Sequence, residues 1–142
     1  MTTYALDSNI VSYFLKNDDT IQSKINEETD KGNDFVIPPT VYFEIMNWLL
    51  KNASTKRMAI FERMYSEKGI GVIDKAVLDI ASTVKLKMRQ QGKGISDDDL
   101  FIAAWCLNHN VPLVTNNTRH FMDIEGLKIL NWVNSNSTSH LC

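Results

Sequence analysis

The segment Tyr4-Ala-Leu-Asp7-Ser-Asn9-Ile-Val-Ser-Tyr-Phe-Leu15 decides the fold that we expect for this chain. It begins as a short apolar run, meets an acid at Asp7, and continues with apolar residues at helical spacing. Ser8 or Asn9 is a suitable N-cap for that helix. We therefore predict a buried strand, an acid at its carboxyl end and a helix that follows at once. In an open α/β sheet, ligands bind beside the carboxyl ends of the strands.

The rest of the chain alternates short apolar runs with amphipathic segments. We predict further strands at residues 35–37, 69–73, 113–115 and 127–130, and further helices at residues 21–31, 41–50, 56–66, 75–91 and 100–108. Short strands that alternate with helices imply parallel pairing and right-handed crossovers. We predict one three-layer α/β/α domain over residues 1–132, with four or five parallel strands, and a disordered tail at residues 133–142.

Composition limits the classes of function. The chain has 142 residues, which suits one domain with a proper core, and its net charge of −2 gives no overall basic field for nucleic acid. Of the two cysteines, Cys106 lies in an apolar helical pattern and is typical of a core residue in a reducing cytoplasm. We see no signal peptide and no apolar run of membrane-spanning length. We therefore expect a cytoplasmic protein with no membrane partner.

Three acids interrupt the apolar pattern where it does not favour a carboxylate. Asp7 ends the first strand, Glu44 lies in a helix that is apolar on nearly every side, and Asp99 follows Asp97 and Asp98 at the start of another helix. Each element follows a strand or stands near its carboxyl end. A cluster of carboxylate oxygens suits Mg²⁺ or Mn²⁺, which can bind a phosphate oxygen and activate water.

Each acid also has a purely structural interpretation. Asp7 could cap a helix, and Glu44 could be partly exposed or pair with a lysine. Asp99 stands in the N3 position of a capping box that starts at Ser96. None of the three acids is specific by itself, so the prediction of a site depends on their joint placement.

Four segments in this order and at these spacings resemble the PIN-domain ribonucleases, most closely the toxins of VapBC toxin–antitoxin systems. The segments are Leu6–Asn9, Val41–Ile45, Ile95–Ala104 and Leu113–Phe121. The resemblance extends over nearly all of residues 1–132. It implies a metal-dependent endoribonuclease, the toxin of a type II toxin–antitoxin system, that hydrolyses RNA phosphodiester bonds. Transfer RNA is the substrate that the family suggests.

The resemblance also implies which residues form the site. It identifies Asp7, Glu44 and Asp99 as catalytic residues that hold Mg²⁺ or Mn²⁺. A fourth acid of the family falls on Asn117, which supplies a carbonyl oxygen without charge, so either one or two metal ions remain open. The supporting residues are Ser8, Asn9, Asp98 and Thr115. The implied mechanism needs no histidine as base, and we do not expect His109, His120 or His140 in that role.

The implied partners are RNA, a VapB-like antitoxin that covers the active site, and a second copy of the chain in a homodimer. A local basic patch would bind the RNA backbone: Lys85, Lys87, Arg89, Lys93 and Arg119. These residues could equally be a solvated helix face. Two other functions remain open. One is a PIN-like domain that binds RNA or a protein without cleaving, which Asn117 and the net charge favour. The other is a nuclease for DNA or ribosomal RNA on the same scaffold.

Overall fold

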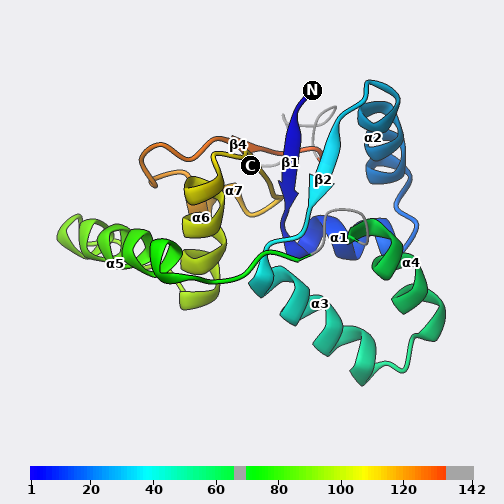
Figure 1. Cartoon of the computed structure of the whole chain (residues 1–142), viewed down its shortest axis with the longest axis horizontal. Helices are drawn as coiled ribbons and strands as arrows, with labels where there is room; N and C mark the ends of the chain where they lie inside the picture. The colour runs from blue at the N-terminus through cyan, green and yellow to red at the C-terminus, as the bar shows by residue number, and fades with distance from the viewer. Residues whose placement is uncertain (66–69, 134–142) are drawn as a thin grey trace.

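A computed structural model describes residues 1–65 and 70–133 of the chain (Figure 1). Within them, four parallel strands form one sheet in the order β2-β1-β3-β4. The strands are β1 (Thr3–Leu6), β2 (Asp34–Val36), β3 (Leu113–Val114) and β4 (Ile129–Leu130). In the register of the sheet, Ala5 of β1 pairs with Val36 of β2 on one side and with Leu113 of β3 on the other. The first strand therefore lies inside the sheet, as its apolar sequence predicts.

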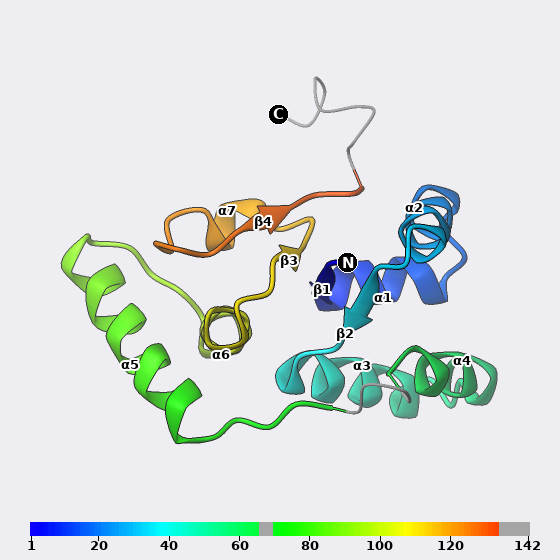
Figure 2. The same ribbon diagram turned by 45° about the horizontal axis from the view of Figure 1, so that its top comes forward.

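Helices flank the sheet. They are α1 (Ser8–Leu15), α2 (Asp19–Asp30), α3 (Pro39–Lys51), α4 (Thr55–Tyr65), α5 (Lys75–Gln90), α6 (Asp97–His109) and the single turn α7 (Thr118–Phe121). Helices α5 and α6 lie on one side of the sheet, and α1 and α2 lie on the other (Figure 2). The predicted α/β class and its parallel sheet are confirmed, with four strands in the described residues. Among the helices of these residues, none has both the length and the apolar character needed to cross a bilayer.

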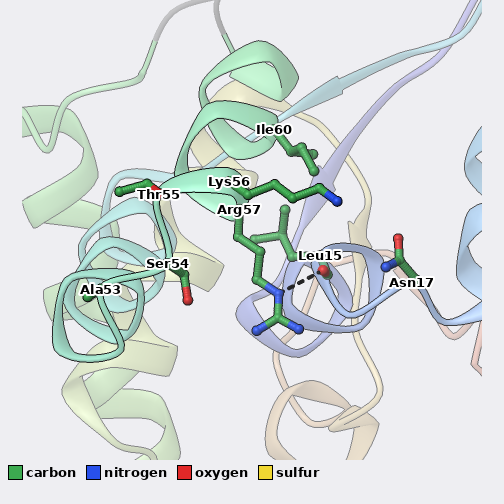
Figure 3. Close-up of a pocket in the computed structure, with 8 residues that line it drawn as sticks. All are labelled: Leu15, Asn17, Ala53, Ser54, Thr55, Lys56, Arg57 and Ile60. Atoms are coloured by element: carbon green, nitrogen blue, oxygen red, sulfur yellow. Dashed lines mark hydrogen bonds between the residues drawn. The ribbon is translucent and has the colours of Figure 1, made fainter.

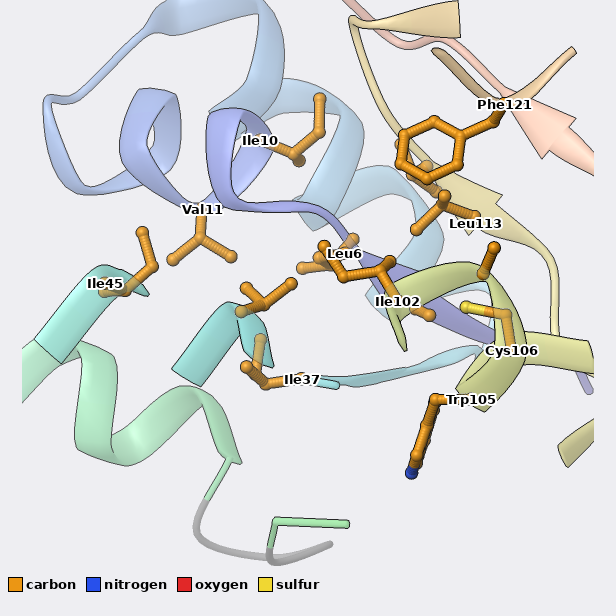
Figure 4. Close-up of a cluster of buried hydrophobic side chains, with 14 of the residues drawn as sticks. Leu6, Ile10, Val11, Ile37, Ile45, Ile102, Trp105, Cys106, Leu113 and Phe121 are labelled. Carbon is orange, nitrogen blue, oxygen red and sulfur yellow. The ribbon is translucent and has the colours of Figure 1, made fainter. Parts of the chain in front are cut away.

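The core lies between the sheet and its helices. Leu6, Ile102, Leu113 and Phe121 are all buried in it (Figure 4). Each such side chain contributes about 1.5–3 kcal/mol relative to an exposed position. Cys106 is a free cysteine within this core, as predicted, and burial raises the pKa of its thiol. Because α6 packs six of its 13 residues in the core, its first turn is held at a fixed place beside the sheet.

The predicted strand at residues 69–73 is wrong for the part that the structure describes. Residues 70–73 pair with no strand, and Gly69 lies outside the described residues. Gly71 instead packs against the indole of Trp105, where a Cβ atom would lie 2.5 Å from Nε1. Val72 is 67% exposed. The apolar run therefore packs one residue on α6 and leaves others at the surface, without joining the sheet.

A polar network ties α2 to the amino end of the sheet. The Glu28 carboxylate is buried and accepts hydrogen bonds from the Tyr4 hydroxyl at 3.0 Å and from Asn33 Nδ2 at 2.8 Å. Lys24 and Lys31 approach the same carboxylate at 3.3 and 3.4 Å. Burial alone would raise the pKa of Glu28, but these hydrogen bonds outweigh it and lower the pKa to about 2. The charged form of Glu28 therefore stabilises the fold.

Candidate active site

Asp7 lies where β1 ends and α1 begins. Its carboxylate caps α1, because Oδ1 accepts a hydrogen bond from the Ser8 amide at 2.7 Å. The predicted caps, Ser8 and Asn9, are therefore wrong. Oδ2 accepts from the Thr115 hydroxyl at 2.7 Å and from Asn9 Nδ2 at 3.3 Å. Asp7 is only 4% exposed, and this burial raises the pKa of its carboxyl although the donors oppose the rise. The carboxyl is both a cap and a buried acid held in one orientation.

Glu44 enters the same region from the second turn of α3. Its Oε1 accepts a hydrogen bond from Ser8 Oγ at 2.6 Å, so Ser8 binds both acids, Asp7 through its amide and Glu44 through its hydroxyl. Partial burial raises the pKa of the Glu44 carboxyl, and the Ser8 hydrogen bond lowers it. The negative charges of Asp98, Asp7 and Asp99 raise it further. Glu44 therefore belongs to the same cluster of negative charge.

Asp99 completes this cluster from the first turn of α6. The Asp99 amide donates to Ser96 Oγ at 3.2 Å, so the predicted capping interaction is present. The Asp99 carboxylate is free of that bond, and its charge raises the pKa values of both Asp7 and Glu44. Asp98 acts on Glu44 in the same way. The structure thus brings the three predicted acids together, and capping does not exclude them from the site.

The loop after β3 packs beside Asp7 and forms hydrogen bonds with it and with Asn9. Thr115 is fully buried, and its Oγ accepts a hydrogen bond from the Asn117 amide at 2.9 Å while its hydroxyl donates to Asp7. The Asn116 amide donates to Asn9 Oδ1 at 3.0 Å. Asn9 and Thr115 therefore tie this loop to α1. The Asn117 side chain is exposed, and it forms no cap hydrogen bond to α7.

His120 is the contact that sequence reasoning missed. Its Nδ1 lies 3.0 Å from Oδ2 of Asp99, although the His120 side chain is 56% exposed. The next residue, Phe121, is fully buried and anchors α7 against the core. The sequence did contain one signal for this contact, because an aromatic residue, Phe121, directly follows the polar loop. His109 instead stacks on Trp105, with ring centroids 4.1 Å apart, and His140 lies outside the described residues.

The predicted basic patch is partly neutralised. Lys85 contacts Asp97 at 3.0 Å, Lys93 contacts Asp123 at 3.1 Å, and Lys87 approaches Glu125 at 3.8 Å. These pairs favour the interpretation of a solvated face for the three lysines. RNA would have to displace such weak surface pairs before it gained their charge.

A separate hollow lies away from the acids. It has a volume of about 440 Å³ and lies between the end of α1 and the start of α4, where Arg57 Nε donates to the Leu15 carbonyl at 3.1 Å (Figure 3). Asp7 caps the other end of α1, and an eight-residue helix is about 12 Å long. The hollow is therefore not part of the acidic site.

The donor set of the acidic site fits a hard divalent cation. In residues 1–65 and 70–133, no three His, Cys, Asp or Glu side chains are already gathered as metal ligands. The charge of Asp99 does, however, raise the pKa values of Asp7 and Glu44, and the carboxylates offer oxygen ligands together with the nearby hydroxyls and amides. Oxygen ligands of this kind suit Mg²⁺ or Mn²⁺. A cation there would offset the mutual repulsion of the carboxylates.

Comparisons with known proteins agree over nearly the whole chain. The family model described as "PIN domain" matches residues 4–127. The chain is 29% identical over 137 residues to "Ribonuclease VapC2" of Haemophilus influenzae, covering 94% of this chain and 100% of that protein. It is 25% identical over 134 residues to "tRNA(fMet)-specific endonuclease VapC" of Shigella flexneri, covering 93% and 99%. Among solved structures, VapBC2 from Rickettsia felis bound to a DNA fragment from its promoter matches with a TM-score of 0.82 at 25% identity, covering 92% of this chain and 99% of that one.

Proposed function

Since this chain belongs to the PIN-domain family, we propose that it is a metal-dependent endoribonuclease, the toxin component of a type II toxin–antitoxin system. The observation that carries the proposal is the joint placement of Asp7, Glu44 and Asp99, whose charges act on one another. Relatives named as ribonucleases align with almost their full length. The family of the chain and the clustering of these acids both support the proposal.

In this proposal Asp7, Glu44 and Asp99 hold Mg²⁺ or Mn²⁺, and the side-chain carbonyl of Asn117 is a further oxygen ligand. When bound, the ion lowers the pKa of a water molecule and stabilises charge on the phosphoryl group. The chain's own hydrogen bonds prepare the acids. Thr115 and Asn9 fix the orientation of the Asp7 carboxylate and favour its charged form.

Ser8 and Asp98 have supporting roles around Glu44. The Ser8 hydroxyl fixes Oε1 of Glu44 and favours the charged form of that carboxyl. Asp98 adds negative charge beside the acids, which strengthens the attraction for a cation. Because these groups come from α1, α3 and α6, the packing of those helices determines the geometry of the site.

The proposed substrate and partners follow from the relatives. Transfer RNA is the proposed substrate, since the Shigella flexneri relative is named for it. A VapB-like antitoxin is the proposed partner, because the Rickettsia felis structure is of a toxin with its antitoxin. We further propose a homodimer in the cytoplasm, and a nuclease domain that extends over residues 1–132. Residues 134–142, which make up most of the predicted disordered tail, lie outside the described residues, so that tail stays a prediction.

A cleavage assay on mixed transfer RNA with Mn²⁺ tests the function. We expect the wild-type protein to cut RNA and Asp7→Asn and Asp99→Asn to lose about a hundredfold in rate, because loss of a ligand should cost at least as much as the 10–100-fold that loss of its hydrogen-bond partner costs. Asp123→Asn is the matched control, because Asp123 is an acid that pairs with Lys93 at the surface. Equal cleavage by all four proteins would exclude the catalytic assignment. RNA binding without any cleavage would favour the non-cleaving alternative.

A further inference from the structure

His120 connects the loop after β3 to the first turn of α6. Its Nδ1 lies 3.0 Å from Oδ2 of Asp99. A carboxylate has only acceptor atoms, so Nδ1 must carry the proton and donate. The hydrogen bond engages Oδ2 and restricts rotation of the carboxylate group. The other oxygen, Oδ1, is then presented in a defined direction.

The backbone that carries His120 is held by two contacts. The backbone amide of His120 donates to the backbone carbonyl of Asn117 at 3.0 Å, and the neighbouring Phe121 is fully buried. Asn117 in turn is tied to Thr115, which binds Asp7. The same short loop therefore carries the donor for Asp7 and the donor for Asp99. Ordering an exposed side chain costs conformational entropy. A backbone that is already fixed lowers the total cost of keeping the contact between His120 and Asp99.

Each of the three acids accepts a hydrogen bond from a side chain of a neighbouring segment. The Thr115 hydroxyl serves Asp7, the Ser8 hydroxyl serves Glu44, and the His120 ring serves Asp99. Each of these donors holds one carboxylate oxygen in place. Such outer hydrogen bonds fix the direction of metal ligands and change metal affinity by about 10–100-fold.

We propose that His120 is a positioning residue that orients the Asp99 carboxylate for the divalent ion. This inference rests on the proposed function, since it assigns a role at the same site. His120 does not contact the ion or act as a base. It acts through Asp99 alone, by the hydrogen bond from Nδ1 to Oδ2.

Mn²⁺ binding without RNA, measured by calorimetry, tests this role. We expect His120→Ala to weaken Mn²⁺ binding about tenfold. We expect His120→Asn to restore most of the affinity, because an asparagine amide can donate from nearly the position of Nδ1. His109→Ala is the control, since it removes an imidazole that stacks on Trp105 at the other end of α6. Circular dichroism and thermal unfolding establish that each variant is folded.

The outcomes separate this role from the proposed function. If wild-type protein binds Mn²⁺ and cuts RNA but His120→Ala binds equally well, the role of His120 is excluded and the nuclease function stands. If pulsed electron paramagnetic resonance shows nitrogen bound directly to Mn²⁺ and His120→Asn abolishes that signal, His120 is a ligand and the positioning role is wrong. If wild-type protein neither binds Mn²⁺ nor cuts RNA, both proposals are wrong. Recovery of His120→Ala cleavage at high Mn²⁺ concentration would support positioning.

Discussion

Replacing Thr115 with valine tests the hydrogen bonds that hold Asp7. The Thr115 hydroxyl donates to Asp7 Oδ2 at 2.7 Å and accepts from the Asn117 amide at 2.9 Å, and both Thr115 and Asp7 are buried. Valine keeps the shape of the side chain and removes the hydroxyl. Asp7 Oδ2 would keep only the longer bond from Asn9 at 3.3 Å.

The size of the effect follows from these two lost contacts. A buried hydrogen bond to a charged group contributes about 1.5–3 kcal/mol, and the lost acceptor for the amide adds about 1 kcal/mol. We expect Thr115→Val to lower the free energy of unfolding by about 2.5–4 kcal/mol at pH 7. The fold should survive, because a domain of this size has about 5–15 kcal/mol.

The deficit should also depend on pH in a defined direction. Burial already raises the pKa of Asp7 in the folded protein, and Thr115 is the donor that opposes this rise most. Its removal raises the folded-state pKa further. A raised carboxyl pKa destabilises the fold above that pKa, and the destabilisation is lost as the pH falls from the folded-state pKa to the lower unfolded-state pKa. The deficit of Thr115→Val should therefore be largest near pH 7 and smaller near pH 4.

Urea denaturation in EDTA, followed by tryptophan fluorescence at pH 7 and pH 4, measures both effects. Thr115→Ser is the control, because it keeps the hydroxyl and should lie within about 1.5 kcal/mol of the wild type. A Thr115→Val protein as stable as the wild type would refute the role of the hydrogen bond. A deficit that stays constant between the two pH values would refute the link to the Asp7 charge.

Further variants test the remaining contacts. Because hydrogen bonds lower the pKa of Glu28 to about 2, wild-type protein should lose about 1–2 kcal/mol of stability, after screening, as the pH falls from 4.5 to 2, and Glu28→Gln should lack this loss in acid denaturation. Gly71→Ala should lower the free energy of unfolding by about 1–3 kcal/mol, because its Cβ would meet an indole ring at 2.5 Å, whereas Gly94→Ala, with open space around it, should change thermal unfolding little. Ser8→Ala should raise the pKa of the Glu44 carboxyl and move the acid limb of the cleavage profile to higher pH, and Ser8→Thr should keep the wild-type profile. An unchanged profile in Ser8→Ala would contradict that hydrogen bond.

The acids could be found from sequence because each one breaks a local pattern. Asp7 ends an apolar run, and Glu44 interrupts an apolar helix, so single windows of sequence reveal both. Their convergence is also accessible, since parallel strands bring their carboxyl ends to one edge. The structure adds that Asp7 caps α1 and also belongs to the cluster of acids. Sequence reasoning treats these roles as alternatives, whereas one carboxylate has two oxygens that can serve both.

Contacts between distant segments could not be read in the same way. Residues 69–73 have the composition of a strand, but in the structure residues 70–73 pair with no strand. Gly71 packs on Trp105 instead. Helix α7 has four residues, which is too short for a helical period to be visible. The contact of His120 with Asp99 spans 21 residues and depends on that turn. Spacing along the chain contains no signal for the contact of Gly71, and it does not show which residue His120 contacts.

The site is arranged so that its own negative charge destabilises the folded chain. Burial raises the pKa values of Asp7 and Glu44, and the neighbouring acids raise them further, which means that the charged cluster is unfavourable without a cation. Neutral donors keep the carboxylates oriented but do not remove the repulsion. A cation that binds the cluster therefore gains the relief of this repulsion in addition to its own ligand bonds. The same relief is available to a basic side chain of an antitoxin. A metal ion and such a side chain would consequently compete for one cluster, so that inhibition would need no change in the fold.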